Sequence, residues 1–309
     1  DQGRQTDLVK LQHLKYFVAV FEEGSFSAGA QRVNATQSGL SMNVRQLEDR
    51  YQVQLLNRSS TGVTPTEVGS QFYQDAVRVL HAATQAEANL RALSGMVTGH
   101  VTVGLMPTFT RAVLGPAILR FAEEFPNVKV TVREAYSGEL SRQILAGELD
   151  FAIVPAFDAD VRLRACVMGS DKEYLVVSAN SSIRSSGSVR LADLPPLDLI
   201  LPSRENARRR KMEQYFASNG IETGRLIELD SMFMSIDLVA RSDWVTILPG
   251  ILCLPDLGGR RRRVIPIRGP ELTVDYIRIE PMSVPLSASG QAFYRVLKDE
   301  LEIALADLG

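Results

Sequence analysis

The stretch that decides the fold of the first part of the chain lies at residues 36–48 and reads Thr36-Gln37-Ser38-Gly39-Leu40-Ser41-Met42-Asn43-Val44-Arg45-Gln46-Leu47-Glu48. Leu40, Val44 and Leu47 repeat at helical spacing and form one apolar face. Thr36 is a good N-cap residue, so the stretch predicts a helix that ends near Tyr51. The other face is polar. A helix of this kind is typical of the second helix of a helix-turn-helix, whose first residues reach base edges in the major groove.

The polar face of this helix carries side chains suited to reading DNA. Glutamine bonds adenine through two hydrogen bonds, serine donates or accepts, and arginine binds bases or phosphates. The alternative is an ordinary polar surface, which a single helix does not exclude. We expect contacts with double-stranded DNA from Thr36, Gln37, Ser38, Ser41, Met42, Arg45 and, beyond the helix, Arg58.

Short elements surround this helix within residues 8–66. They are a helix from Leu11 that Gly24 ends, a short helix through Arg32 capped by Ser25 or Ser27, and two strands at Gln54–Leu56 and Gly62–Thr64. Residues 57–62 form the turn between the strands, and Arg58 in that turn is placed for a backbone or minor-groove contact. Three helices followed by a hairpin predict a winged helix-turn-helix.

A long helix is expected over residues 66–95, capped by Thr66. Its apolar residues follow a spacing close to a heptad, which is the pattern of a helix-helix seam. At 1.5 Å per residue the helix would be roughly 40 Å long. We expect it to form a dimer interface with the same helix of another subunit; the alternative is docking along its own C-terminal domain. The seam consists of Val68, Phe72, Ala76, Val79, Ala83, Ala86, Leu90 and Leu93.

From residue 97 the chain alternates between strand and helix patterns, which predicts parallel sheets with helical crossovers. The expected strands are His100–Leu105, Lys129–Glu134, Asp150–Val154, Glu173–Ser178, Leu197–Leu201, Arg225–Leu229, Trp244–Leu248 and Val274–Glu280. The expected helices are Arg111–Phe125, Gly138–Ala146, Arg204–Ser218, Ser231–Arg241 and Ser287–Leu308. The length suits two small α/β lobes, with a ligand beyond the carboxyl ends of the strands.

Composition agrees with a globular chain of more than one domain. The chain has 309 residues, of which 45% are apolar and 23% charged, enough for more than one core. The net charge of −2 excludes a protein that coats nucleic acid through bulk positive charge. Residues 8–66 hold six Lys or Arg and four Asp or Glu, a local charge of +2. This small excess suits a binder that relies on a positioned helix.

The sequence offers no catalytic or cofactor motif. His13, His81 and His100 are not paired with a nucleophile or spaced as metal ligands, and no glycine-rich nucleotide fingerprint is present. Cys166 and Cys253 are far apart, and we expect free thiols in a reducing cytosol, although a disulfide stays open. We therefore expect no enzyme, cofactor or metal. No run approaches the ~18 apolar residues of a membrane span, and residues 1–7 are a polar tail, so we expect a cytoplasmic protein.

Several motifs together resemble LysR-type transcriptional regulators. In the N-terminal part they are Leu14-Lys15-Tyr16-Phe17-Val18-Ala19-Val20, Glu23-Gly24-Ser25-Phe26-Ser27, Thr36-Gln37-Ser38-Gly39-Leu40-Ser41, Arg45-Gln46-Leu47-Glu48, Leu55-Leu56-Asn57-Arg58 and Thr64-Pro65-Thr66-Glu67-Val68-Gly69. Looser matches follow at Phe125-Pro126-Asn127-Val128, Gly147-Glu148-Leu149-Asp150-Phe151-Ala152-Ile153 and Ile247-Leu248-Pro249. The resemblance covers nearly the whole chain.

The resemblance implies a regulator that binds promoter DNA with its winged domains and a co-inducer between two lobes like those of periplasmic solute-binding proteins. It also implies a homotetramer built from dimers, with RNA polymerase as a further candidate partner. The expected domains are 8–66 for DNA binding, 67–96 for the linker helix and 97–309 for effector binding. Lobe I would span about 97–168 and 272–309, and lobe II about 169–271.

The expected effector site lies in the loops between strands and helices of both lobes. A helix N-terminus favours an anion, so we expect a small organic anion. Thr108 and Ser137 resemble the polar pair of the family's pocket; the alternative is that these residues and Ser203 are only helix caps. The expected site consists of Met106, Pro107, Thr108, Phe109, Ser137, Pro155, Ser203 and Arg204.

Some features depart from the family pattern or stay outside it. Met42 stands where many members have Arg or Lys, and offers apolar contact to a thymine methyl instead. Arg241-Ser242-Asp243-Trp244 replaces a glycine-flanked turn in lobe II. The basic runs Arg208–Lys211 and Arg260–Arg263 are expected to be solvated surface, with contact to DNA or a neighbouring subunit as the alternative. The competing functions are a two-lobed solute-binding module without regulatory DNA binding and an enzyme of doubly wound fold.

Overall fold

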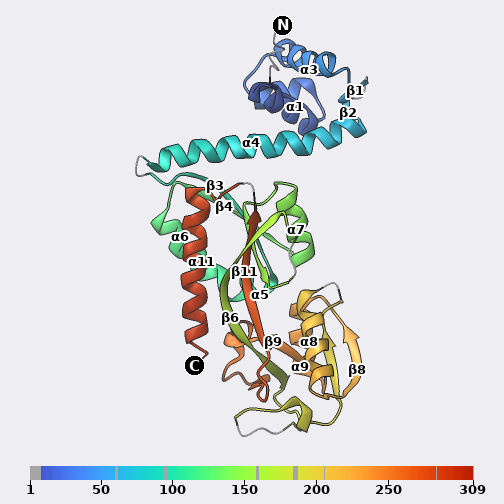
Figure 1. The fold of residues 1–309 in the computed structure, drawn as a ribbon, viewed down its shortest axis with the longest axis vertical. Coiled ribbons are helices and arrows are strands. Elements are labelled where there is room, and N and C mark those ends of the chain that lie inside the picture. The colour runs from blue at the N-terminus through green and yellow to red at the C-terminus, as the bar shows by residue number, and fades with distance from the viewer. Residues whose placement is uncertain are drawn as a thin grey trace. The chain divides into compact units, whose positions relative to one another are not determined.

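The computed structural model describes residues 8–59, 62–93, 96–157, 160–183, 187–204, 206–282 and 284–308. The expected tail of residues 1–7 lies outside these residues, as do Ser60 and Thr61 of the expected turn. The chain divides into two compact units near Leu90 (Figure 1). None of the helices in the described part combines the length and apolar character that a bilayer span requires.

The first unit contains a winged helix-turn-helix followed by a long helix. Its elements are α1 (Leu11–Glu23), α2 (Phe26–Arg32), α3 (Gln37–Tyr51), β1 (Leu56–Ser59), β2 (Gly62–Pro65) and α4 (Glu67–Leu93). The hydroxyls of Ser25, Thr36 and Thr66 accept hydrogen bonds from the amides three residues later and so begin α2, α3 and α4. Gly24 ends α1 in the left-handed conformation, with φ of 60°. The expected caps at Thr36 and Thr66 are confirmed, and Ser25 rather than Ser27 caps α2.

The core of this unit is built from the apolar faces of the helices and the start of the wing. Phe17 lies at its centre and packs against Phe72 of α4 at a ring distance of 5.1 Å. A side chain at Gly69 would collide with the carbonyl oxygen of Leu55, so glycine lets α4 approach the wing. The buried set includes Leu14, Val20, Leu40, Val44, Leu47, Leu55 and Leu56.

The first strand of the wing lies later than expected. It was expected at Gln54–Leu56, but β1 runs from Leu56 to Ser59 and pairs Arg58 with Val63. Arg58 is therefore in a strand and not in the turn. The cause is the Glu48 carboxylate, which accepts hydrogen bonds from the amides of Leu55 and Leu56 and holds the chain before the strand begins.

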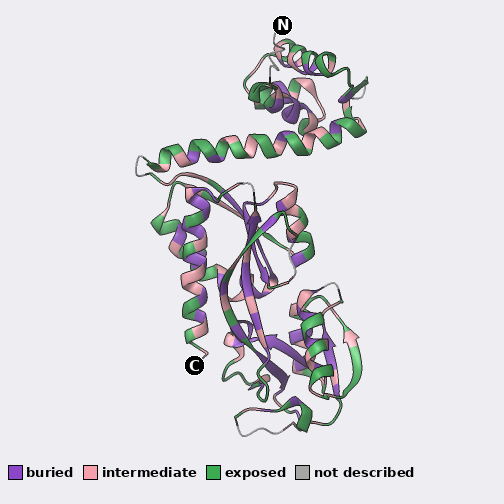
Figure 2. Ribbon diagram, viewed as in Figure 1, coloured by how far each residue is buried: buried purple, intermediate pink, exposed green. Residues whose placement is uncertain are grey.

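The expected apolar seam of α4 is wrong at its beginning. Phe72 packs on the winged core and Ala76 is buried in it, because this part of α4 completes that core. Further along, Val79 and Ala86 are exposed, and Leu90 and Leu93 are 68% and 86% exposed. Figure 2 shows how much of α4 is exposed or half-buried along its length.

The second unit is an α/β domain of two lobes. Lobe I holds β3 (Gly99–Leu105), α5 (Pro107–Ala112), α6 (Leu114–Glu124), β4 (Val128–Glu134), α7 (Ser137–Leu145), β5 (Phe151–Pro155), most of β6 (Leu163–Ser178), β11 (Thr273–Pro281) and α11 (Ala288–Ala306). Lobe II holds the end of β6, β7 (Leu197–Leu201), α8 (Ala207–Ser218), β8 (Thr223–Glu228), α9 (Met232–Arg241), β9 (Val245–Pro249), α10 (Gly250–Cys253) and β10 (Arg262–Pro266), with short 3-10 turns at Leu191–Asp193 and Leu254–Asp256.

One long strand joins the two lobes. The sheet order is β4-β3-β5-β11-β6-β9-β7-β8, with β10 also paired to β6. Residues 163–172 of β6 pair with β11, whereas Glu173–Ser178 pair with β9 and β10. The transition between lobes therefore falls at Lys172 and Glu173, and the expected boundary at residues 168 and 169 lies inside the pairing with β11.

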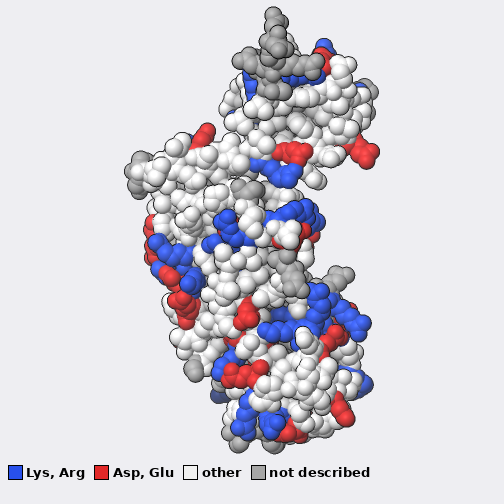
Figure 3. Space-filling model, in the orientation of Figure 1, with Lys and Arg blue, Asp and Glu red and all other residues white. Residues whose placement is uncertain are grey.

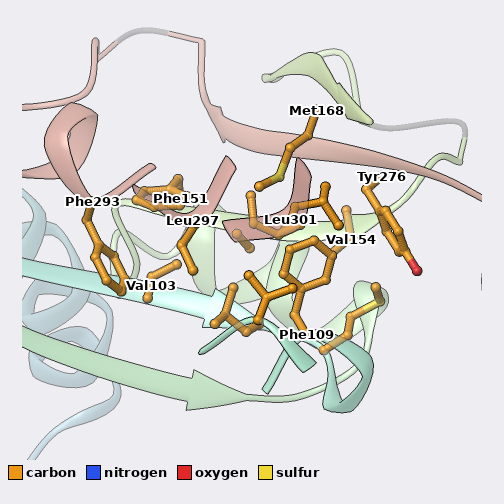
Figure 4. Packing of buried hydrophobic residues seen from close by; sticks show 14 of the residues in the cluster. Val103, Phe109, Phe151, Val154, Met168, Tyr276, Phe293, Leu297 and Leu301 are labelled. Atoms are coloured by element: carbon orange, nitrogen blue, oxygen red, sulfur yellow. The ribbon is translucent and has the colours of Figure 1, made fainter. Parts of the chain in front are cut away.

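Apolar side chains fill the interior of lobe I between the sheet and its helices. Phe109 meets Tyr276 edge-on at a ring distance of 4.9 Å, and Phe121 of α6 meets Phe293 of α11 at 4.8 Å. Figure 4 shows Phe109, Val154 and Tyr276 gathered in this cluster, with the tyrosine hydroxyl at its margin. This packing fixes the carboxyl end of the sheet, where the expected effector loops lie.

Three expectations about this unit need correction. The helix expected at Arg111–Phe125 is two helices, α5 and α6, and the first begins already at Pro107. The first ten residues of β6 were missed, because their exposed side chains break the apolar pattern of a buried strand. The loop expected at Arg260–Arg263 ends in β10, so Arg262 and Arg263 belong to a strand.

Candidate DNA interface and inter-lobe cleft

The N-terminal half of α3 presents an open polar surface. Gln37, Ser38 and Arg45 are exposed, and Met42 is 58% exposed. The Oε1 atom of Gln37 accepts a hydrogen bond from Ser27 of α2 at 3.0 Å, which leaves the amide nitrogen as a donor. Such a donor is half of the pair that glutamine offers to adenine. The structure therefore brings the expected helix residues together on one side of α3.

Arg58 belongs to wing strand β1, and its side chain reaches toward this surface. Its guanidinium stacks on the Phe26 ring at 4.6 Å, donates to Ser41 at 3.3 Å and lies 3.4 Å from Glu48. These contacts connect the wing with the recognition helix. Ser41, which was expected only to contact DNA, also holds Arg58 in place.

Sequence reasoning missed the role of Glu48. One carboxylate oxygen of Glu48 accepts from the amides of Leu55 and Leu56, and the other faces Arg58. The only sign of this role in the sequence is a carboxylate near the end of the predicted helix. The sequence alone does not show that the amides of Leu55 and Leu56 fold back onto this carboxylate. Glu48 therefore links α3 to the start of the wing and to Arg58.

The expected effector loop of lobe I is shorter and more buried than anticipated. Met106 lies before α5 without a capping side chain, Pro107 begins the helix, and Thr108 and Phe109 are buried inside it. Because α5 has only six residues, its N-terminus gives weak grounds for an anion site. Ser137 is the buried first residue of α7, so neither hydroxyl is a helix N-cap.

The other expected effector residues divide between the cleft and the surface. Pro155 lines a small cavity between the lobes. The amide of Ser203 donates to the Asp230 carboxylate at 2.9 Å, and Arg204 is exposed and lies 3.6 Å from Glu213. The cap of α8 is Asn206, not Ser203. The alternative that the serines and Thr108 are helix caps is therefore wrong.

A side-chain contact crosses the cleft between the lobes. The hydroxyl of Tyr136, which follows lobe I strand β4, donates to the backbone oxygen of Asp230 in lobe II. Burial, together with the nearby Asp230 and Glu134 carboxylates, raises the pKa of Tyr136. The hydroxyl therefore stays protonated at neutral pH and remains a donor. This contact is one of those that link the two lobes in the described structure.

Arg208 is the central cation of the cleft. It lines both small cavities between the lobes, one with Pro155 and Lys211, the other with Tyr136 and Asp230. It is only 6% exposed and forms two hydrogen bonds to Glu173, of 2.9 and 2.7 Å, and one of 3.1 Å to the Ile247 carbonyl. The Nη1 atom has no partner among the described residues.

The basic run on α8 is thus only in part the solvated surface expected from the sequence, because Arg210 and Lys211 are exposed and the two arginines before them are buried. Burial would lower the pKa of the Arg208 guanidinium, but the Glu173 carboxylate more than offsets this and raises it. Arg209 is buried as well; it donates to Glu213 at 2.9 Å and to the Pro202 carbonyl at 2.9 Å. Sequence reasoning missed both because most of their partners come from other elements, namely β6, β9 and the loop after β7. Figure 3 shows basic side chains gathered around α8.

A second buried carboxylate lies close to this pair. Asp171 accepts from the Ile251 amide at 2.9 Å and from the Tyr276 hydroxyl at 3.4 Å. Burial raises the pKa of Asp171 to about 6, and the charge of nearby Glu173 adds to the increase. Its protonation state therefore changes close to physiological pH.

The described residues contain no group of His, Cys, Asp and Glu that could hold a metal ion. Cys166 is half-buried and Cys253 is buried, and both are free thiols. Burial raises the pKa of the Cys253 thiol, which keeps it protonated and unreactive.

Both parts of the chain match known families. Residues 11–70 match the family described as bacterial regulatory helix-turn-helix protein, lysR family, and residues 94–302 match the LysR substrate binding domain. The nitrogen assimilation regulatory protein nac of Klebsiella aerogenes is 28% identical over 242 residues, covering 78% of each chain. The regulator AlsR of Bacillus subtilis is 27% identical over 243 residues, covering 78% of this chain and 80% of its own.

Solved structures share the fold over almost the whole chain. A cysteine-to-aspartate variant of full-length OxyR from Pseudomonas aeruginosa has a TM-score of 0.71 at 21% identity, covering 96% of this chain and 95% of its own. Full-length CbnR in complex with its target DNA has a TM-score of 0.56 at 22% identity, covering 94% and 99%. The chain therefore belongs to the LysR family of DNA-binding transcriptional regulators, which are not enzymes and carry a C-terminal effector-binding domain.

Proposed function

We propose that this regulator reads promoter DNA with the exposed face of α3. The observation that carries the proposal is the group of open side chains Gln37, Ser38, Met42 and Arg45, next to the held guanidinium of Arg58. Thr36 and Ser41 complete the surface as cap and as partner of Arg58. Gln37 would read a base edge, and Arg58 would contact the backbone.

We infer that two chains pair through the far half of α4. Val79, Leu90 and Leu93 are exposed apolar residues that a subunit in water would cover. Phe72 and Ala76 cannot take part, because they belong to the winged core. Two such dimers would form a homotetramer, and RNA polymerase would be the partner at an activated promoter.

For the effector we infer a small organic anion in the inter-lobe cleft. The unpartnered Nη1 of Arg208 is the anchor, and Lys211, which lies 3.8 Å from Asp275, adds a second cation at the rim. An arginine with two of its nitrogens already held by Glu173 is preorganised and loses little freedom on binding. Thr108 and Ser137 would support the pocket from lobe I.

The cleft links ligand binding to lobe movement through Tyr136. An effector between the lobes would compete with the Tyr136–Asp230 contact and shift the population toward another lobe arrangement. In a dimer on DNA, such a shift would alter half-site spacing and the bend of the duplex.

Two measurements test these proposals. A gel shift with the region upstream of the regulator's own gene should show a complex at low salt, and absence of a shift would contradict the DNA proposal. Isothermal titration against a panel of small carboxylic acids should find a ligand whose binding weakens in Lys211→Ala and does not weaken in Tyr136→Phe, because this variant removes the contact with which the ligand competes. Equal binding by the wild type and Lys211→Ala, or a loss of binding in Tyr136→Phe, would contradict this account of the cleft.

A further inference from the structure

A second hollow lies on lobe II, apart from the inter-lobe cleft. It measures about 280 Å³ and lies between the turn at Leu254–Asp256 and strand β10. None of the residues that line it lines either cleft cavity. Its wall includes Asp256, Leu257, Gly258, Gly259, Arg262 and Arg263. This volume lies just below the usual range for ligand pockets, about 300–1,000 Å³, and so suits only a small ligand.

The single carboxylate in this wall is already neutralised. Asp256 forms a double contact with Arg262, through Nη2 and through Nε at 3.1 Å, and Arg111 lies 3.7 Å away. Arg262 is held further by the Ile236 carbonyl at 3.2 Å. The Asp256 charge is therefore shared between two guanidinium groups, and the wall keeps a positive excess.

Arg263 is held in the wall by backbone atoms only. Its Nη2 donates to the carbonyls of Ser181 at 2.9 Å and Ile183 at 2.7 Å. Its Nε is shielded from water and has no partner in the described structure. An unsatisfied buried donor is costly, so the guanidinium of Arg263, a residue that lines the hollow, keeps one unused donor.

Two more arginines lie in the chain between the lining residues Gly259 and Arg262. Arg260 and Arg261 are exposed, and neither side chain has an ion pair or hydrogen bond with any other described residue. The loop that carries them turns at Gly258, with φ of 73°, and a side chain at Gly259 would come within 2.9 Å of the Asp256 carbonyl. The tight turn brings Arg262 back onto Asp256, and Arg260 and Arg261 lie between these two residues in the chain.

We propose that this hollow is a binding site for a small phosphorylated anion with two or more negative charges. Planar guanidinium groups match phosphate oxygens through paired hydrogen bonds. Leu257, Val264 and Ile265 add an apolar wall for the non-phosphate part of a ligand. A concave pocket favours a small molecule over the flat backbone contact that duplex DNA requires. The ligand would bind lobe II independently of the cleft effector and so give the regulator a second input.

Inorganic pyrophosphate is the probe, titrated into the full-length wild type by calorimetry at low and moderate salt. We expect saturable binding that falls at least tenfold in Arg260→Ala/Arg261→Ala, whose exposed side chains leave the fold intact. The matched control is Arg241→Ala, an exposed arginine of the same lobe that is paired with Asp237 at 3.0 Å. It should bind pyrophosphate like the wild type.

Three results would overturn the proposal. One is no saturation by pyrophosphate at millimolar concentration. Another is an equal loss of binding in the Arg241 control, which would show a general charge effect. The third is displacement of pyrophosphate by a short duplex DNA at lower concentration than by triphosphate, which would assign the arginines to nucleic acid. The cleft proposal is unaffected by all three, because Tyr136 and Lys211 are unchanged.

Discussion

Two helices of this regulator use their polar side chains in opposite ways. Helix α3 leaves Gln37 and Arg45 in water, while its Leu40 and Val44 build the core beneath. Helix α8 buries Arg208 and Arg209 and binds them to carboxylates and carbonyls. The first helix keeps its polar groups available for a partner outside the chain. The second uses them to join β6, β9 and the loop after β7.

The difference lies in what each polar group contributes to the folded state. An exposed side chain of α3 contributes little to folding, so replacing it should change DNA binding and leave stability nearly unchanged. A buried charge of α8 has lost its hydration, so removing its partner leaves a penalty in the folded state. Variants of the two helices should therefore separate cleanly in two measurements, unfolding and DNA affinity.

The largest expected effect is on α8. Arg208→Ala leaves Glu173 buried without its partner and should lower the free energy of unfolding by about 3–5 kcal/mol. Chemical denaturation of the full chain, followed by circular dichroism, measures it. The matched control is Arg210→Ala, an exposed residue of the same helix, which should stay within about 0.5 kcal/mol of the wild type. An equal loss of unfolding free energy in both variants would contradict the proposed difference between buried and exposed arginines.

Asp171 tests the cost of burying a charge in a second way, through the pH dependence of the free energy of unfolding. Its folded pKa of about 6 lies above the value of about 3.9 in an unfolded chain, so the folded state binds an extra proton between these values. The stabilisation is fully present below pH about 4 and is lost as pH rises through 6, with a total of about 3 kcal/mol. Unfolding curves from pH 4 to 7 should show this slope in the wild type and lack it in Asp171→Asn. An unchanged slope in the variant would assign the pH dependence to another group.

The two regions also differ in how well their sequence predicts them. The winged part follows from local signals, since the caps at Thr36 and Thr66 and the apolar spacing of α3 act within a few residues. Its errors concern long-range contacts. Glu48 determines where β1 begins, and Phe72 turns inward because the winged core lies beside it.

The two lobes show more clearly what cannot be predicted from the sequence. Most strands and helices were predicted within a few residues, and so was a cleft between two lobes, but of the expected effector residues only Pro155 lines its two described cavities. The burial of Arg208 depends on its hydrogen bonds to Glu173, 35 residues earlier, and to Ile247, 39 residues later. No local sequence pattern shows that these residues come together. A run of four basic residues on a polar helix has the composition of a solvated surface. Burial of two of them is a property of the tertiary fold alone.

On α3, Gln37→Ala tests the exposed side of the comparison. Losing the amide should reduce discrimination between the cognate site and a site with one changed base pair by about 1–3 kcal/mol. Affinity for unrelated DNA should hardly change, because phosphate contacts remain. Fluorescence anisotropy with matched and mismatched duplexes measures both quantities. Uniform weakening on all duplexes would mean that Gln37 contacts the backbone.

Arg58 combines features of the exposed residues of α3 and the buried arginines of α8. Replacing it should give the smallest free-energy change among these variants. It stacks on Phe26 and faces Glu48 like a structural arginine, yet its side chain remains about one third exposed, at 34%. If it also contacts a phosphate, Arg58→Ala should reduce the slope of log affinity against log salt by about one. Unfolding should change by less than about 1 kcal/mol, since an exposed pair contributes little. Arg58→Lys keeps the charge and loses the stacking, so it should preserve the slope. A slope that falls equally in both variants would show that Arg58 acts by holding the wing against α3, as the arginines of α8 hold lobe II.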